Sequence, residues 1–224
     1  MNDNSIREVF DGVYMIGGKL ATLNLAKGRR VYNEELVNIE GREYRLWNPY
    51  RSKLAAAMLK GLKRMAIKSG SSVLYLGAAT GTTSSHVSDI VGREGSVYAI
   101  ELSERNMREL IKVCESRANM VPILADARDS SVYAQYIEAE ACNVIYQDVS
   151  TKEQAKVLLE NSRFLKRGGI AYFIVKSQSI SISSRPESIY EKELNLLKDK
   201  FKVLEKFGLE PYDSLHLFTV LEKL

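Results

Sequence analysis

From Val73 to the end of the chain, short apolar runs alternate with segments whose apolar residues have helical spacing. Runs as short as Val73–Leu76 are typical of strands that are buried on both faces of a sheet. The alternation predicts an α/β fold, a largely parallel sheet with helices on both faces. The short connection through Glu210-Pro211-Tyr212 makes the last two strands antiparallel neighbours. The predicted strands are Val73–Leu76, Ser96–Ile100, Met120–Leu124, Asn143–Tyr146, Ile170–Val175, Phe201–Phe207 and Leu215–Leu221.

Helical patterns occupy the segments before and between these strands. In Lys53–Lys68, the side chains of Leu54, Met58 and Leu62 fall on one face, and Ser52 is a candidate N-cap. The other predicted helices are Thr83–Val91, Glu104–Ser116, Val132–Tyr136, Lys152–Phe164 with Thr151 as its cap, and Glu187–Lys200.

Two stretches are predicted to interrupt the regular elements. Gly168-Gly169 is expected to end the preceding helix, because glycine commonly follows the last helical turn. The serine-rich stretch Ser177–Ser184 has no regular period and precedes Pro186, so a loop is expected there. Loops that follow strand ends often hold substrate.

The first 46 residues have a different pattern, in which short strands flank tight turns. Asp11-Gly12 and Glu40-Gly41 are hairpin signals between apolar pairs. We therefore predict a small antiparallel β domain over residues 1–47, which is structural or a docking surface, and a main domain over residues 48–224. Asn48-Pro49 marks the boundary, because proline disfavours helix in the residue before it.

A glycine turn follows the first strand of the main domain and gives it a candidate ligand site. The turn has the sequence G-A-A-T-G from Gly77 to Gly81, and a helical pattern begins directly after it. Glycines let the backbone approach a ligand, and a helix start presents free N–H groups. The next three strands end in Glu101, Asp126 and Asp148. Acids are common in such loops, but three of them beside a glycine turn favour a binding site at this edge of the sheet.

Composition narrows the class of protein without naming a function. The 224 residues are 45% apolar and 27% charged, which suits one core domain and a small appendage. The net charge of +4 is compatible with an RNA partner. Arg51–Lys68 contains basic side chains and no acid, so it predicts a solvated helix face or a phosphate-facing surface with equal weight.

Cysteine content and hydropathy bear on location and cofactor. Cys114 and Cys142 lie in apolar patterns without metal-ligand spacing, so we expect free thiols in a reducing cytoplasm and no metal site. No apolar run approaches the roughly 18 residues of a membrane span, so no membrane association is expected.

Four segments together are similar to one known family. LYLGAATGTTSSHVSDIVG from Leu74, GSVYAIE from Gly95, ILADAR from Ile123 and VIYQDV from Val144 resemble fibrillarin in its archaeal short form. Arg51-Ser52-Lys53 also matches this family. The resemblance implies a class I methyltransferase fold, a Rossmann-like sheet of seven strands with the last one antiparallel. It implies an RNA ribose 2′-O-methyltransferase that uses S-adenosylmethionine.

The same resemblance implies a set of partners. In this family a box C/D guide RNA selects the target by base pairing, within a ribonucleoprotein that contains a Nop-domain scaffold protein and a kink-turn-binding ribosomal-type protein. The expected targets are ribosomal RNA and, in addition, transfer RNA. The absence of a separate RNA-reading module in the sequence agrees with recognition by partners.

The resemblance also assigns cofactor contacts. Glu101 is expected to accept hydrogen bonds from the ribose, and Asp126 from the adenine amine. After Asp148 this chain has Val149-Ser150-Thr151 where the family usually has Val-Ala-Gln, so backbone contacts carry over and the glutamine side chain does not. The expected cofactor-binding residues are Gly77, Ala78, Thr82, Thr83, Glu101, Leu102, Asp126, Ala127, Asp148, Val149, Ser150 and Thr151.

Four residues match the family's catalytic Lys-Asp-Lys-His set. Lys176 is the expected base for the 2′-hydroxyl, Lys53 its positive neighbour, Asp148 the group that orients the amine, and His216 a group that polarises the network. Each also has an ordinary interpretation, namely solvated lysines, a helix N-cap and a structural histidine. His86 is expected to be structural and to pack near the glycine turn.

Other functions remain possible from the residues alone. A methyltransferase of a small molecule or of a protein would share the fold and the cofactor site. A non-catalytic assembly protein of a ribonucleoprotein would keep the fold without the four polar residues. A nicotinamide oxidoreductase fits less well, because the turn lacks the G-x-G-x-x-G spacing.

Overall fold

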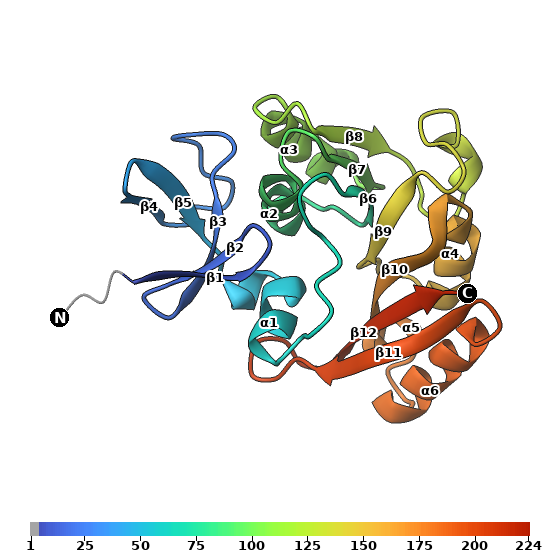
Figure 1. Cartoon of the computed structure of the whole chain (residues 1–224). Coiled ribbons are helices and arrows are strands. Elements are labelled where there is room, and N and C mark those ends of the chain that lie inside the picture. Colours follow the sequence, from blue (N-terminus) through green and yellow to red (C-terminus); the bar gives the residue numbers. More distant parts are fainter. Residues whose placement is uncertain (1–4) are drawn as a thin grey trace.

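The computed structural model describes residues 5–224, which form two β-sheets (Figure 1). The smaller sheet is antiparallel in all its pairings and has the strand order β1-β2-β3-β5-β4. The predicted turns at Asp11-Gly12 and Glu40-Gly41 are both present. Glu40 and Gly41 have φ of 51° and 77°, the left-handed pair that a two-residue hairpin requires. The strands are β1 (Ile6–Phe10), β2 (Val13–Ile16), β3 (Lys19–Leu23), β4 (Leu36–Ile39) and β5 (Arg42–Leu46).

The larger sheet has seven strands in the order β11-β12-β10-β9-β6-β7-β8. All pairings from β10 to β8 are parallel, and β12 is antiparallel to both β10 and β11. This confirms the predicted α/β fold with an antiparallel last strand. The strands are β6 (Ser72–Leu76), β7 (Ser96–Glu101), β8 (Met120–Leu124), β9 (Cys142–Gln147), β10 (Leu165–Lys176), β11 (Phe201–Gly208) and β12 (His216–Lys223).

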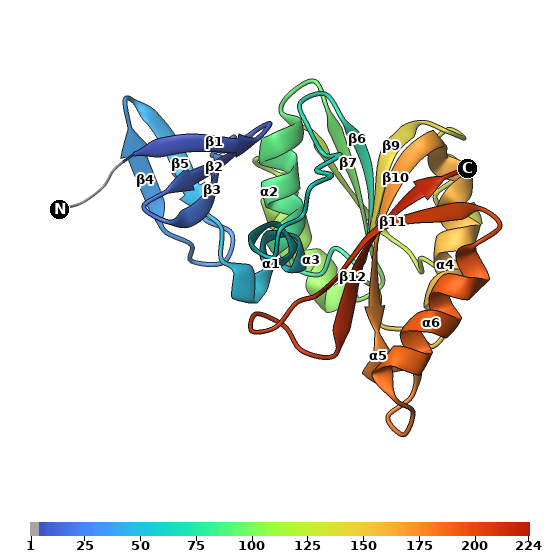
Figure 2. The same cartoon turned by 60° about the horizontal axis from the view of Figure 1, so that its bottom comes forward.

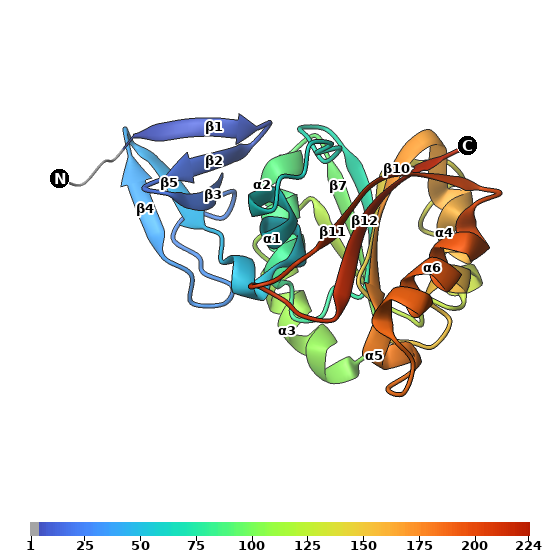
Figure 3. The ribbon, with the colours of Figure 1, turned by 90° about the horizontal axis from the view of Figure 1, so that it is seen from below.

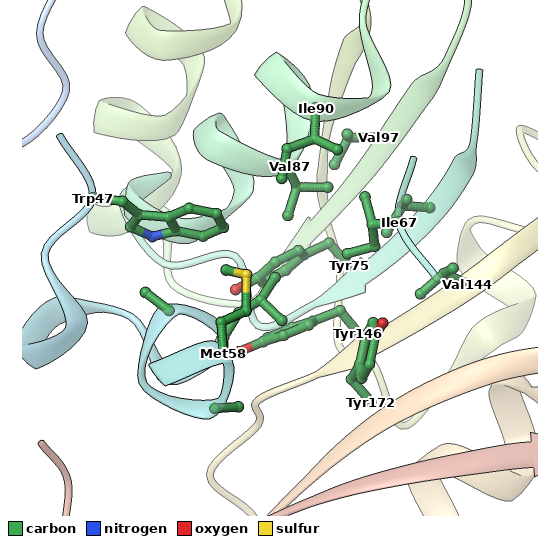
Figure 4. Packing of buried hydrophobic residues seen from close by; sticks show 14 of the residues in the cluster. Trp47, Met58, Ile67, Tyr75, Val87, Ile90, Val97, Val144, Tyr146 and Tyr172 are labelled. Carbon is green, nitrogen blue, oxygen red and sulfur yellow. The ribbon is translucent and has the colours of Figure 1, made fainter. Parts of the chain in front are cut away.

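Helices cover both faces of the larger sheet (Figure 2). On one face lie α1 (Lys53–Leu59), α2 (Thr82–Val91) and α3 (Glu104–Cys114), and on the other lie α4 (Gln154–Asn161), α5 (Ser177–Ile180) and α6 (Pro186–Leu197). Side chains of one strand alternate between the two faces, so Val73 and Tyr75 join the first core and Leu74 and Leu76 the second. Figure 4 shows the first core, where the stacked rings of Tyr75 and Tyr146 are 4.5 Å apart between their centroids.

The small sheet packs beside α2 (Figure 3). Charged side chains join the two parts: Arg45 of β5 lies 2.8 Å from Asp89 of α2, which also binds Arg117 at 2.5 Å. The guanidinium of Arg45 further contacts Glu34. All four side chains are almost completely buried, so removing one would leave an uncompensated charge in the interior.

The predicted helix Lys53–Lys68 is wrong in its second half, because α1 ends at Leu59. Gly61 has φ of 98°, which non-glycine residues rarely adopt. The N–H of Leu62 binds the carbonyl of Ala57, and the N–H of Gly61 binds that of Met58. This pair of hydrogen bonds is the Schellman motif, which ends a helix at a left-handed glycine.

The predicted helix Lys152–Phe164 is shorter in the structure. It comprises α4 and one 3₁₀ turn, Ser162–Phe164, and Glu153 is its N-cap residue in place of Thr151. Gly168-Gly169 does not end this helix but lies inside β10, where the register against β9 shifts between Leu165 and Ile170. Glycine in a strand often marks such an irregularity.

Two shorter predictions are also wrong. Val132–Tyr136 is not a helix; a 3₁₀ turn, Ser130–Val132, is followed by further turns. Ser177–Ser184 is not entirely a loop, because β10 passes directly into the four-residue helix α5. The chain has no regular element from Ser181 until Pro186, which begins α6.

Candidate active site

The carboxyl ends of β6 to β10 meet at one edge of the sheet and enclose a pocket of about 440 Å³. Ligands of open α/β sheets bind at this edge. Of the residues predicted from sequence, the pocket lining includes Gly77, Glu101, Leu102, Asp126, Ala127, Asp148, Val149, Ser150, Thr151 and Lys176. Residues that were not predicted also line it: Ala79, Ile100, Ser103, Asn106, Ala125, Arg128 and Val157.

The glycine turn brings the backbone close to Asp148. Gly77 has φ of 84°, and a Cβ built on it would lie 2.7 Å from the carbonyl oxygen of Asp148. The N–H groups of Gly77 and Ala78 both bind the carbonyl of Ile100 at 3.0 Å. The narrow space between β6 and β9 therefore requires glycine at this position.

Glu101 links the turn to the following helix. One carboxylate oxygen accepts the N–H of Ala79 at 2.8 Å, and the other accepts the N–H of Ser103 at 2.9 Å. The side chain of Asn106 also reaches this carboxylate, at 3.4 Å. Each carboxylate oxygen has two acceptor sites, so room remains for a ligand hydroxyl.

Asp126 is held by an arginine that the sequence analysis did not single out. Arg128 donates from Nε at 2.9 Å and from a terminal nitrogen at 2.5 Å to Oδ2 of Asp126. Bonds from Arg128 hold the pKa of Asp126 below its usual value, against the effect of partial burial. The Asp126 carboxylate therefore lines the pocket and is already paired with Arg128.

Asp148 lies between two lysines. Lys53, the first residue of α1, places Nζ 3.0 Å from Oδ2, and Lys176, the last residue of β10, places Nζ 2.8 Å from Oδ1. Burial acts to raise the pKa of Asp148, but the two ammonium groups outweigh it and the pKa is lowered. Three residues far apart in the sequence therefore form one charged cluster, in which Asp148 and Lys176 line the pocket.

The backbone and amine of Lys176 have further partners. The buried side chain of Gln154 accepts the N–H of Lys176 at 2.8 Å and donates to its carbonyl at 3.0 Å. The amine donates to the carbonyl of Asp148 at 2.9 Å and to the hydroxyl of Ser150 at 3.1 Å. Gln154, at the start of α4, therefore fixes the end of β10 and the backbone position from which the Lys176 side chain extends.

His216 does not touch Asp148 directly. It lies opposite Lys176 in the β10–β12 ladder, and its Nδ1 is 2.5 Å from Oδ1 of Asp213. The other oxygen of Asp213 is 3.6 Å from Nζ of Lys53. Asp213 therefore joins the histidine to the lysine–aspartate cluster.

Three predicted cofactor residues are not in the lining of this pocket. Ala78 is buried, and its N–H is bonded to the neighbouring strand. Thr82 is the first residue of α2, and the hydroxyl of the buried Thr83 donates to Ser52 at 3.0 Å. Ser52 caps α1 as predicted, accepting the N–H of Ala55, so this threonine connects the starts of two helices.

His86 has the structural environment that was expected. Its ring nitrogens contact the hydroxyls of Thr22 and Tyr32, both at 2.8 Å, and the ring stacks on Trp47. Burial, with Arg45 and Arg117 nearby, holds its pKa well below the ordinary value, so the imidazole is neutral.

The remaining chemistry-bearing groups do not form a second centre. Burial raises the pKa of the Cys114 and Cys142 thiols to about 11, so both are protonated at neutral pH. Within residues 5–224, no group of three or more His, Cys, Asp or Glu side chains is placed to hold a metal ion. None of the helices described is both long enough and apolar enough to cross a bilayer.

Comparison with known proteins decides the family. The family model described as fibrillarin matches residues 5–223. The chain belongs to the fibrillarin family. A curated member, the fibrillarin-like rRNA/tRNA 2′-O-methyltransferase of Pyrococcus furiosus, is 47% identical over an alignment of 220 positions that covers 96% of each chain. The resemblance inferred from the sequence is thereby confirmed.

Solved structures of fibrillarins have the same fold throughout. The Methanococcus jannaschii fibrillarin pre-rRNA processing protein superposes with a TM-score of 0.94 at 41% identity, over 100% of this chain and 99% of that one. Aeropyrum pernix fibrillarin, in complex with natively bound S-adenosyl-L-methionine, gives 0.89 at 40% identity over 97% of both chains. The fibrillarin of a fibrillarin/Nop5p complex gives 0.87 at 36% identity, over 97% of this chain and 100% of that one.

In this fibrillarin, two site features could be found only in three dimensions. Asp213 and Arg128 lie in turns without a regular pattern, and only the folded chain shows that Asp213 lies beside Lys53 and that Arg128 covers Asp126. A weak signal for Arg128 was its place in the ILADAR segment. Ser150 and Thr151, where the chain departs from the usual family residues, both line the pocket.

Proposed function

We propose that this fibrillarin transfers a methyl group from S-adenosylmethionine to the ribose 2′-hydroxyl of ribosomal and transfer RNA. The observation that carries the proposal is the cluster of Lys53, Asp148 and Lys176 at the pocket that Glu101 lines. A base beside a cofactor pocket is what attack by a hydroxyl requires. The proposal agrees with the printed function of the Pyrococcus furiosus relative.

The pocket suits S-adenosylmethionine in shape and in charge. When bound, this cofactor supplies a methyl group activated by a sulfonium. The free acceptor site of Glu101 would take a ribose hydroxyl, and the backbone N–H of Ala127 would donate to an adenine nitrogen. The side chains of Leu102 and Val157 supply apolar surface for the ring, and the Asp148 carboxylate a negative charge for the sulfonium side. The absence of a Cβ at Gly77 lets the glycine turn lie against the backbone of Asp148, which also lines the pocket.

Lys176 is the residue we assign as the base. Its backbone is fixed on both sides by Gln154, and its amine is held by Asp148 and Ser150. A hydroxyl is a poor nucleophile until a base takes its proton during the transfer. Lys53 shares the carboxylate of Asp148 and so competes for the same negative charge. The side chain of Asp148 is thus placed to orient the amine, which receives the proton of the hydroxyl after it has released its own and is in its neutral form.

Recognition of the target is assigned to partners. A solved relative forms a complex with Nop5p. We propose that a Nop-domain scaffold protein, a kink-turn-binding ribosomal-type protein and a box C/D guide RNA hold this chain on its target. We further propose that the small β domain is a structural unit or a docking surface that packs on the main domain and does not take part in catalysis, since the pocket lining begins only at Gly77. In a cell without a nucleus, this particle would be cytoplasmic.

Transfer of labelled methyl groups to RNA tests the function. The chain should methylate one ribose of a target RNA when guide RNA and both partner proteins are present, and little or none when it is alone. Site-specific methylation of naked RNA by the isolated chain would contradict the dependence on a guide. Transfer only to a protein or a small molecule would favour the alternative acceptor class, and no transfer to any acceptor a non-catalytic assembly role.

A further inference from the structure

Asp213 lies in the connection between β11 and β12 and is placed by the turn itself. Its N–H and that of Tyr212 both bind the carbonyl of the buried Leu209, at 3.3 and 2.9 Å. Its carboxylate, in contrast, accepts no backbone hydrogen bond in the part of the chain that the structure describes. The side chain is therefore not needed to close the turn, and its two oxygens point to other partners.

Those partners are two of the four residues assigned to catalysis. Oδ1 lies 2.5 Å from Nδ1 of His216, and Oδ2 lies 3.6 Å from Nζ of Lys53. Because Lys53 also contacts Asp148, which contacts Lys176, the five side chains form one continuous series. Asp213 is the only member of the series that connects the histidine to the rest among the residues described.

We propose that Asp213 is a positioning residue for methyl transfer, which holds His216 in one orientation and keeps Lys53 between two carboxylates. The inference rests on the proposed function, and it extends the assigned set by one residue. It identifies Asp213 as acting through its neighbours and not as a group that touches the reacting atoms.

The contact with His216 fixes the state of the ring. Nδ1 lies 2.5 Å from the Asp213 carboxylate and makes no hydrogen bond of ordinary geometry to any other group within residues 5–224. A carboxylate next to Nδ1 favours the tautomer with its proton there and leaves Nε2 as an acceptor, because the partner of one ring nitrogen decides the role of the other. The ring is thereby held beside Lys176, its partner across the ladder.

The contact with Lys53 balances the charge of the cluster. With Asp213 present, two carboxylates face two ammonium groups. Without it, a single carboxylate would have to hold both Lys53 and Lys176. Lys53 would then compete more strongly for Asp148 and displace the amine that we assign as the base. The side chains are only 18% to 25% exposed at Lys53 and Asp213, so water screens this competition incompletely.

Asp213→Ala in the assembled particle is the direct test. The single-turnover rate at saturating cofactor should fall roughly 10- to 100-fold, the loss typical of a group that orients a functional residue. Cofactor affinity should not change, because Asp213 is outside the pocket lining. The matched control is Asp199→Ala, on the exposed turn before β11, which should keep the wild-type rate. A wild-type rate for Asp213→Ala would overturn the proposal.

A comparison with the His216→Ala variant distinguishes a positioning role of Asp213 from a general disruption of the site. In a His216→Ala protein, Asp213→Ala should lower the single-turnover rate by a smaller factor than it does in the wild type, because one of the two partners of Asp213 is already absent. If Asp213→Ala lowers the rate by the same factor in the wild type and in the His216→Ala protein, the proposal is overturned. If Asp213→Ala does not fold, Asp213→Asn, which keeps the shape and removes the charge, is measured in its place under the same two criteria.

Nuclear magnetic resonance of the imidazoles gives a readout that does not depend on activity. The chain has two histidines, and His86 is buried with Thr22, Tyr32 and Trp47 as its partners, so its ring signals serve as an internal control. At a pH where both rings are neutral, Asp213→Ala should shift His216 toward the tautomer protonated at Nε2 and leave His86 unchanged. Unchanged signals of His216 would overturn the proposal. If instead the wild-type particle transfers no methyl group, the proposed function fails, and this spectrum still decides the contact.

Discussion

The carbonyl oxygen of Asp148 occupies the space where a side chain at Gly77 would begin. The two residues directly follow the neighbouring strands β6 and β9, and the N–H of Asp148 binds the carbonyl of Leu76 at 3.0 Å. A Cβ at residue 77 would lie 2.7 Å from the Asp148 oxygen, so one of the two backbones would have to move. The glycine turn and the lysine–aspartate cluster are therefore one structural unit.

Gly77→Ala should damage both stability and cofactor binding. The left-handed φ of 84° and the contact with Asp148 should together cost about 1–3 kcal/mol of unfolding free energy. Gly70→Ala is the matched control, because Gly70 has φ of 76° and nothing within 4 Å of a built Cβ. Urea denaturation and titration calorimetry of both variants provide the measurement. Equal effects of the two changes would show that backbone conformation alone is responsible.

Glu101→Ala should weaken the binding of S-adenosylmethionine and of its demethylated product. A hydrogen bond to a charged group contributes about 1.5–3 kcal/mol, so we expect a loss of affinity of roughly ten- to a hundredfold. Because Glu101 also holds the N–H of Ala79, part of this loss is disorder of the turn. Glu104→Ala, exposed at the start of α3, should bind as the wild type does. Unchanged affinity in Glu101→Ala would contradict the ribose assignment.

The sheet could be predicted from the sequence because its strands are buried on both faces. Such strands are continuous apolar runs, as in Val73–Leu76. Their ends place Glu101 and Asp148 at one edge of the sheet, independently of the conformation of the loops. The end of α1 could not be predicted from apolar spacing, because Leu62 continues the pattern after the helix has ended at Leu59. Local backbone conformation overrode the periodicity there.

The site was predictable to the extent that its residues follow strands or match the family. Asp213 does neither. Its role depends on its proximity to Lys53, which is 160 positions earlier in the sequence (213 minus 53). The pairing of Asp126 with Arg128 depends on the conformation of a turn, which has no periodic signature. Ion pairs between turns are a property of the folded chain.

Acid should destabilise the protein partly through Asp148. Burial raises its pKa, but Lys53 and Lys176 outweigh this and lower the pKa below that of the unfolded chain. A carboxyl whose folded pKa is lowered stabilises the fold above the unfolded value, about 3.9, and loses that contribution as the pH falls below it. Urea midpoints between pH 3 and pH 6 should therefore fall less steeply in Asp148→Asn than in the wild type.

The control for this measurement is Asp199→Asn, which changes an exposed aspartate on a turn. Its midpoints should follow the wild-type slope over the same pH range. Asp148→Asn should also be less stable at neutral pH, because it leaves two partly buried ammonium groups without their shared carboxylate. A wild-type slope in Asp148→Asn would show that other carboxylates account for the acid sensitivity.

Lys176→Ala should lower the rate of methyl transfer and leave cofactor affinity nearly unchanged. The amine contacts Asp148 and Ser150, and we assign it to the acceptor hydroxyl and not to the adenosine of the cofactor. A positioned base contributes roughly a hundredfold to ten-thousandfold, so the single-turnover rate in the assembled particle should fall by that factor. Lys202→Ala, exposed on β11, is the control and should keep the wild-type rate.

Lys176→Arg distinguishes a base from an electrostatic contact to RNA. A guanidinium keeps the positive charge but does not readily lose a proton, so it cannot act as a base. It can still reach the carboxylate of Asp148 and preserve the charge balance of the cluster. If Lys176 is the base, the arginine variant should be nearly as slow as Lys176→Ala, with cofactor binding measured in parallel. A rate near that of the wild type would mean that the lysine only attracts the phosphate backbone, and that another group takes the proton of the hydroxyl.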